Sequence, residues 1–193
     1  DAGRQIDILT ASIILKLIKN DIGEYFPKNA YKGKYIEEIA KKLDKKININ
    51  MFKQLNDNFS DDPEEEIDQV IKSLQELNSD SWNLIKSFSL KDIVKSIEDD
   101  LKLFNVNFDK WFYESSLGVL ENTSSDIASA INKLEKNGHA YVKDNAIWLN
   151  TDISDDDKHR VLIRDNGKAT YFASDVAYHK NKVDRGFDQL INV

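Results

Sequence analysis

The spacing of apolar residues changes once along the chain, close to Asn105, and this change constrains the fold more than any other feature. Before it, apolar residues recur every three or four positions, which is typical of helices that bury one face. After it, short apolar runs alternate with turn residues and further helical patterns, which is typical of short strands packed with helices. We therefore expect an α/β protein in which residues 23–105 are almost wholly helical.

Four helices are predicted in the first half of the chain, over about 6–18, 33–43, 64–78 and 90–104. The first presents one wide apolar face, formed by Ile6, Leu9, Ile13, Ile14, Leu17 and Ile18. Ser89 is predicted to open the fourth helix, because Asp92 follows it three residues later in a variant of the capping box.

An acidic stretch runs from Asn56 to Asp68 without any basic residue. Asp62 can cap a helix that has Pro63 as its first residue. Three glutamates then fall in the first turn, where the helix dipole favours negative charge. We therefore interpret this stretch as the start of a helix, and a cation site is the weaker alternative.

The second half is predicted to alternate strands and helices. A short strand is expected in "VNFDKWFYESSL", followed by a helix opened by Thr123 and ended by the left-handed cap that Gly138 permits. "HAYVKDNAIWLN" is predicted to form a hairpin around Asp144 and Asn145. One more strand, a turn and a helix follow in "RVLIRDNGKATYF", and "FDQLINV" begins another run of strand type. Since both ends interrupt such patterns, we expect an internal piece of something larger.

Composition excludes several kinds of chemistry. The absence of cysteine rules out disulfides, zinc–thiolate sites, cysteine nucleophiles and iron–sulfur clusters. Charged residues make up 32% of the chain and no long apolar run occurs, so neither a membrane span nor a signal peptide is predicted and we expect a cytoplasmic protein. The net charge of −7 argues against wide, nonspecific contact with nucleic-acid phosphates.

No catalytic group can be assigned from motifs. His139, His159 and His179 invite a metal-site hypothesis, together with the acidic run 155–157, but their spacing matches no zinc motif. Such a run is more often a solvated loop, so we expect no metal site. Neither a nucleophile elbow nor a phosphate-cradling glycine loop is present.

The stretch "RDNGKATYFASDVAYH" is the best candidate site. Tyr171, Asp175 and His179 follow at four-residue intervals and would share one ridge of a helix capped by Thr170. If Phe172, Val176 and Val183 form the buried stripe, Tyr171 and Asp175 lie at the border between core and cleft. A carboxylate beside a phenol suits an ammonium or guanidinium ligand, although the same pair is common in helices without a binding role.

Five stretches, in order, resemble the central part of bacterial-type arginyl-tRNA synthetases: "DAGRQID", "YKGKYIEEIAKKL", "FDKWFYESSL", "DKHRVLIRDNGKATYFASDVAYHKNK" and "RGFDQLINV". The resemblance implies part of a doubly wound, nucleotide-binding (Rossmann-type) catalytic domain of class I with a mostly helical insertion. Residues 1–22 and 106–193 would belong to the catalytic fold, and residues 23–105 would form the insertion.

The resemblance also implies an activity, namely ATP-dependent ligation of L-arginine to its tRNA through an arginyl-adenylate, with Mg²⁺ as the counter-ion of ATP. The family's two ATP-binding signatures would lie before Asp1 and after Val193, so the chain alone is expected to be inactive. We expect a monomer. Tyr171 and Asp175 match the tyrosine and aspartate that the family uses to bind arginine. The resemblance gives His179 no role, and it places Asp1 and Gln5 in a motif at the active-site floor without a definite contact.

An alternative from a different class of function remains open. The chain would then be a non-catalytic helical interaction module whose charged faces bind a protein or tRNA. Such binding would depend strongly on salt concentration.

Overall fold

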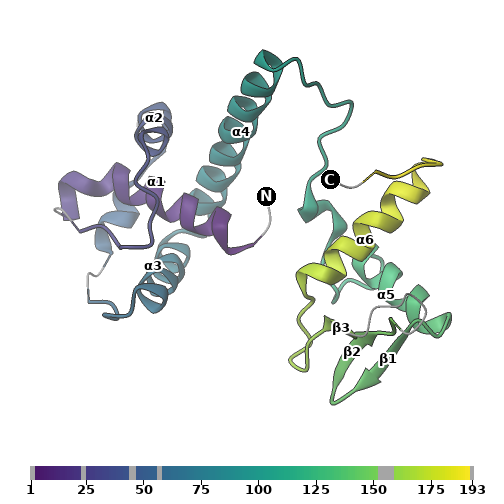
Figure 1. The fold of residues 1–193 in the computed structure, drawn as a ribbon. Coiled ribbons are helices and arrows are strands. Elements are labelled where there is room, and N and C mark those ends of the chain that lie inside the picture. Colours follow the sequence, from purple (N-terminus) through teal and green to yellow (C-terminus); the bar gives the residue numbers. More distant parts are fainter. Residues whose placement is uncertain (1–2, 23–24, 44–46, 56–57, 152–158, 192–193) are drawn as a thin grey trace. The chain divides into compact units, whose positions relative to one another are not determined.

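The computed structural model describes residues 3–22, 25–43, 47–55, 58–151 and 159–191, with the backbone alone for residues 19–22. The chain forms two compact units, Asp1–Lys110 and Trp111–Val193 (Figure 1). Each unit has a hydrophobic core of its own, the first built from helices and the second from helices and a small sheet. The molecule is therefore helix-rich, with a single three-stranded sheet among the residues that the structure describes.

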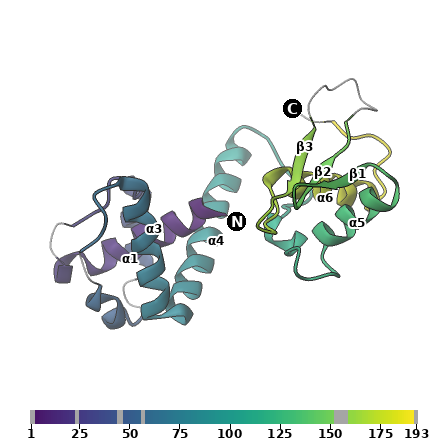
Figure 2. The same ribbon diagram turned by 90° about the horizontal axis from the view of Figure 1, so that it is seen from below.

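The helical unit is organised around its first helix. It contains α1 (Arg4–Ile22), α2 (Lys34–Leu43), α3 (Pro63–Leu77) and α4 (Ser79–Leu103), with the short 3-10 helix η1 (Asn50–Gln54). Helix α1 packs against all three other α-helices, and Figures 1 and 2 show it running among them. Because it is covered from several sides, α1 is apolar over most of its surface rather than along one stripe. The helices predicted over 6–18, 33–43 and 64–78 are confirmed.

Two hydroxyl groups are buried inside α1 and both are satisfied. Thr10 and Ser12 donate to the carbonyl oxygens of Ile6 and Ile8, each at 2.7 Å. Ser12 also accepts a hydrogen bond of 2.8 Å from the backbone N–H of Tyr31. The buried hydroxyl thus fixes the segment that leads into α2.

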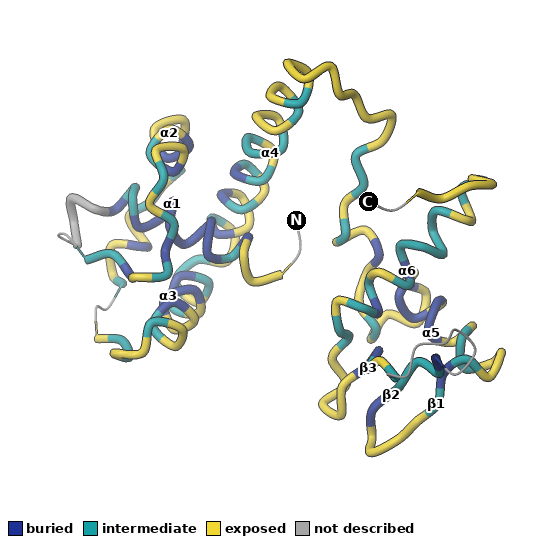
Figure 3. The backbone as a smooth tube through the Cα atoms, viewed as in Figure 1, coloured by how far each residue is buried: buried dark blue, intermediate teal, exposed yellow. Residues whose placement is uncertain are grey.

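The prediction for α4 was wrong at its start. The helix begins at Ser79 rather than near Ser89, and the Asn78 side chain caps it by accepting from the Ser81 N–H at 2.9 Å. Trp82 and Ile85 are buried in the core, and Ser89 is buried on the same face. Tertiary burial of these side chains outweighs the polar composition of the first turns. The second half of the helix is largely exposed (Figure 3).

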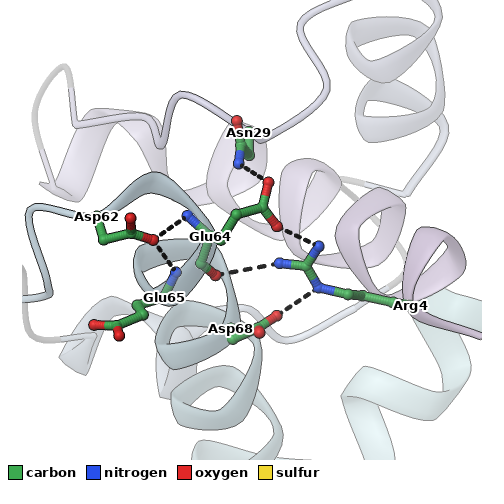
Figure 4. Close-up of polar contacts among 6 residues, drawn as sticks. All are labelled: Arg4, Asn29, Asp62, Glu64, Glu65 and Asp68. Carbon is green, nitrogen blue, oxygen red and sulfur yellow. Dashed lines mark hydrogen bonds and ion pairs between the residues drawn. The ribbon is translucent and has the colours of Figure 1, made fainter.

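The acidic stretch does start a helix, as predicted. Asp62 caps α3 by accepting hydrogen bonds from the N–H groups of Glu64 and Glu65 at 2.9 and 3.0 Å, and Pro63 is the first helical residue (Figure 4). These bonds satisfy two of the donors that a helix start leaves unpaired. The acidic residues here are therefore part of the helix start.

Arg4 connects this helix start to α1. Its Nε and Nη1 atoms lie 2.7 Å from Asp68 and 2.6 Å from Glu64, and Asn29 donates to the other oxygen of Glu64 at 2.7 Å (Figure 4). Hydrogen bonds to Asp68 and then to Glu64 raise the pKa of the Arg4 guanidinium. Two carboxylates of the stretch considered as a weak cation site are thus neutralised by an arginine of the same chain.

The α/β unit contains η2 (Glu114–Leu117), α5 (Asp126–Lys136), β1 (Ala140–Lys143), β2 (Ala146–Leu149), β3 (Arg160–Ile163) and α6 (Tyr171–Asp184). The strands pair antiparallel in the order β1-β2-β3, with an irregularity at Ile147 and Trp148. Helices α5 and α6 pack together, and α6 also contacts β3 and η2. Residues from all of these segments except β2 supply the buried core of this unit.

Local turn and cap predictions in this unit are confirmed. Asp144 and Asn145 both have positive φ, as a two-residue hairpin turn of type I′ requires. Gly138 has φ of 74° and its N–H bonds to the Glu135 carbonyl oxygen, which ends α5 with a left-handed cap. The start of α5 differs slightly from the prediction, because Ser125 rather than Thr123 caps it.

Two predicted strands are not formed. Residues 106–113 are irregular and lead into η2, and residues 187–191 are irregular and exposed. An apolar run becomes a strand only when another strand offers its hydrogen bonds, and neither run has such a partner in the part of the chain that is described. Residues 106–113 therefore have the alternating apolar pattern of a strand but no neighbouring strand to pair with among the described residues.

The strand pairs observed in the described ranges are antiparallel, so the doubly wound sheet stays a prediction. The predicted boundary between the catalytic fold and the insertion, at residues 22 and 23, also stays a prediction. Within this chain, α1 shares its core with α2, α3 and α4. None of the described helices is long and apolar enough to cross a membrane.

Replacing Phe52 by alanine should destabilise the helical unit by about 3–5 kcal/mol, because the ring is fully buried and its removal leaves a cavity. Met51 lies in the same short helix with 43% of its surface exposed, so Met51→Ala should change stability by less than about 0.5 kcal/mol. Urea unfolding followed by circular dichroism measures both. Equal effects of the two substitutions would contradict the assigned core.

Candidate functional site

Helix α6 is fixed at its first residue by a turn and a cap. The turn before it is closed by the Gly167 N–H, which donates to the Arg164 carbonyl oxygen at 2.9 Å, and Gly167 has φ of 79°. Thr170 accepts from the Ala173 N–H at 3.3 Å, and its hydroxyl donates to the Val161 carbonyl oxygen of β3 at 2.8 Å. The Thr170 side chain therefore caps α6, as predicted from the sequence, and also ties the helix to the sheet.

The buried face of α6 includes the predicted Phe172 and Val176, which pack against the core, but its most buried residues are two alanines that were not predicted. Ala173 and Ala177 are fully buried, whereas Phe172 and Val176 are only half-buried and Val183 is 59% exposed. Small residues face α5 and β3 because these elements approach α6 closely, and a larger stripe would not fit there. Tyr171 and Asp175 lie on the exposed side of the helix.

An open hollow of about 230 Å³ lies on this side of α6. Tyr171, Ser174, Asp175 and Tyr178 line it from the helix, and Phe112, Glu114 and Leu117 line it from the segment around η2. The structure thus brings Tyr171 and Asp175 to one site. His179 is half-buried and is not among the lining residues, so the three-residue ridge does not act as a unit.

Two of the described residues that line the hollow are acidic and none of them is basic. Within the described part of the chain, the side-chain carboxylates of Asp175 and Glu114 make no hydrogen bond or ion pair. Two carboxylates that face one hollow favour a positively charged ligand, and the nearby phenol and serine hydroxyls can add directional hydrogen bonds. This arrangement suits a ligand with several N–H donors.

One wall of the hollow is an aromatic pair. The rings of Phe112 and Tyr178 are stacked with their centres 4.4 Å apart and their planes at 24°. Lys182 holds its ammonium group 4.3 Å from the centre of the Tyr178 ring, and the Arg185 guanidinium carbon lies 5.8 Å from that of Phe112. These contacts join α6 to the segment that carries Glu114.

Comparison with known proteins gives a consistent result along the whole chain. The chain is 39% identical over 199 residues to the arginine–tRNA ligase of Acidithiobacillus ferrooxidans and 37% identical over 207 residues to that of Aquifex aeolicus. It is 40% identical over 205 residues to the arginine–tRNA ligase of Legionella pneumophila (strain Corby). All of this chain is covered, and 34–35% of each relative. No protein-family model matches.

Solved structures point to the same proteins. A chain from Campylobacter jejuni assigned as an arginyl-tRNA synthetase superposes with a TM-score of 0.64 at 26% identity, over 98% of this chain and 36% of that one. The resemblance to arginyl-tRNA synthetases is confirmed. The chain spans about a third of the length of these relatives.

Glu114 and Phe112 were missed as site residues, although they lie in one of the stretches that resemble arginyl-tRNA synthetases, "FDKWFYESSL". The apolar pattern of this stretch predicts a strand. No feature of the neighbouring sequence shows that the stretch lies beside a helix almost sixty residues later. The one sequence feature that indicated a binding role is that an acidic residue, Glu114, directly follows three aromatic residues.

The remaining candidates lie on other segments of the chain or are not described. Asp1 and the acidic run 155–157 lie outside the described residues, and Gln5 is exposed on α1 in the helical unit. His159 accepts or donates a hydrogen bond of 3.0 Å with the Tyr141 hydroxyl. No group of three potential metal ligands comes together in the described ranges.

Replacing Thr170 by alanine should cost about 1 kcal/mol of stability, because α6 loses its cap and its tie to β3. Thr170→Ser keeps the hydroxyl and should retain most of that stability. Urea unfolding followed by circular dichroism compares the two variants. If serine were as destabilising as alanine, the hydroxyl would not be the group that matters.

Proposed function

We propose that this chain is the central part of an arginine–tRNA ligase and that the hollow beside α6 forms part of the arginine-binding site. The observation that carries the proposal is that Asp175 and Glu114, both without a cationic partner among the described residues, face one hollow. The similarity of the whole chain to arginine–tRNA ligases supports the same ligand.

Guanidinium chemistry fits the residues that line the hollow. The side chain of arginine ends in a planar fork of five N–H donors that is always charged, and carboxylates accept from it in pairs. Asp175 would take one edge of the fork, and Glu114 would take another from the opposite wall. Tyr171, one turn before Asp175, would pack beside the ligand or hydrogen-bond to it with its hydroxyl.

The same groups would provide selectivity. A lysine ammonium is a compact charge that cannot satisfy two separated carboxylates with the same geometry. Citrulline keeps the size of arginine but lacks the charge, so it would leave a carboxylate without a cation. A site based on such hydrogen bonds rejects analogues strongly, and a separate editing step would be unnecessary.

The proposal assigns the remaining steps to the full-length protein. It would activate arginine with ATP and Mg²⁺ and transfer it to tRNA, and the described residues of this chain would supply part of the amino-acid pocket. Residues 1–22 and 106–193 would belong to a doubly wound class I catalytic domain in which 23–105 form a helical insertion. We expect the protein to act in the cytoplasm as a monomer.

In the full-length protein, Asp175→Ala should lower kcat/KM for arginine in ATP–pyrophosphate exchange at least about 100-fold, because a charge-assisted contact to the ligand is lost. Asp184→Ala is the matched control. Asp184 lies on the same helix but pairs with Lys180 and does not line the hollow. Its removal should leave the exchange kinetics within about twofold of the wild type.

Wild-type protein that shows no arginine-dependent exchange would overturn the proposed function. Unchanged kinetics in Asp175→Ala, with arginine-dependent exchange in the wild type, would overturn only the placement of the pocket. Circular dichroism of both variants checks that the fold is retained.

Glu114→Gln should raise the KM for arginine about tenfold while kcat changes less, because the amide keeps the size of the side chain but not its charge. The ratio of kcat/KM values for arginine and citrulline should fall in the same variant, since one of the groups that rejects a neutral side chain is gone. Steady-state exchange with both amino acids measures this. An unchanged ratio would remove Glu114 from the pocket.

A further inference from the structure

We propose that the stacked rings of Phe112 and Tyr178 are a positioning element that sets the gap between Glu114 and Asp175. The proposal rests on the proposed function, because it concerns the selectivity of the same hollow. Phe112 and Tyr178 would act through the two carboxylates that they hold in place, rather than through a contact of their own with the ligand.

The two carboxylates come from segments that are far apart in the chain. Asp175 is carried by α6, and Glu114 begins the short helix η2. A 3-10 helix of four residues has little rigidity of its own. The position of Glu114 therefore depends on what anchors the residues on either side of it.

Two anchors flank Glu114. Phe112, two residues earlier, stacks on Tyr178 of α6 with ring centres 4.4 Å apart. Leu117, three residues later, is buried in the core of the unit with 1% of its surface exposed. Between them, the Ser116 N–H donates to the Tyr113 carbonyl oxygen at 2.9 Å, which closes the turn. The ring pair thus fixes the segment to α6 before Glu114, and Leu117 fixes it to the core after Glu114.

The partner ring is well placed to transmit this constraint. Tyr178 follows Asp175 by three residues, so both side chains project from neighbouring positions on the same side of α6. Lys182, one turn further along, places its ammonium group 4.3 Å from the Tyr178 ring centre, a cation–π contact that restricts the ring. The stack thus links the side of α6 that bears Asp175 directly to the residue two positions before Glu114.

Removing one ring should therefore impair arginine binding more than turnover. In the full-length protein, Phe112→Ala should raise the KM for arginine about tenfold, with kcat within about threefold and the KM for ATP unchanged, since a displaced carboxylate weakens one ligand contact. Phe112→Tyr keeps the stacked ring and should restore the KM to within about twofold of the wild type.

Tyr113→Ala is the matched control. Tyr113 is the neighbouring aromatic residue, is 40% exposed, and does not line the hollow, so this substitution should leave the KM for arginine unchanged. Active-site titration of every variant corrects for protein that has not folded. If Phe112→Ala lowers only the active fraction, or shifts KM no more than Tyr113→Ala, the ring pair is structural alone and the proposal is overturned.

A double substitution tests whether Phe112 acts through Glu114. If it does, adding Phe112→Ala to Glu114→Gln should raise KM by less than about threefold, because the carboxylate whose position is lost is already absent. Full additivity, a further tenfold rise, would overturn the proposal. The proposed function has its own readout, since it fails only if the wild type lacks arginine-dependent exchange.

Discussion

The close contact of α6 with the rest of the α/β unit is the interaction on which the candidate site depends. Ala173 and Ala177 are buried at this contact, and residues of this size let helix and core approach closely. Thr170 ties the first turn to β3, and Asn181 hydrogen-bonds to Asp126 of α5 at 3.1 Å near the other end. These contacts fix the buried side of α6, and residues on its other side line the hollow.

The exposed side of α6 carries a phenol ring and a carboxylate that line the hollow. Tyr171 is 69% exposed, and Asp175 has no cationic partner among the described residues. Other carboxylates of the chain stabilise the fold through ion pairs, such as Glu64 and Asp68 with Arg4.

Features set by neighbouring residues were predictable. The cap at Asp62, the left-handed glycine at 138 and the turn at Asp144 and Asn145 each depend on hydrogen bonds or dihedral angles within a few residues. The predictions were wrong where contacts between residues far apart in the sequence determine the local structure. Helix α4 starts eleven residues earlier than predicted, because Trp82 and Ile85 are buried in the core, and residues 106–113 remain irregular because no strand among the described residues pairs with them.

The sequence by itself determined that Tyr171 and Asp175 lie one turn apart on a capped helix, because helical spacing and capping are local properties of the chain. Only the tertiary structure decided which residues of that helix are most deeply buried, and these are Ala173 and Ala177 rather than Phe172 and Val176. It also decided that Glu114 and Phe112 lie beside them, since contacts between distant segments follow from packing that no local pattern records.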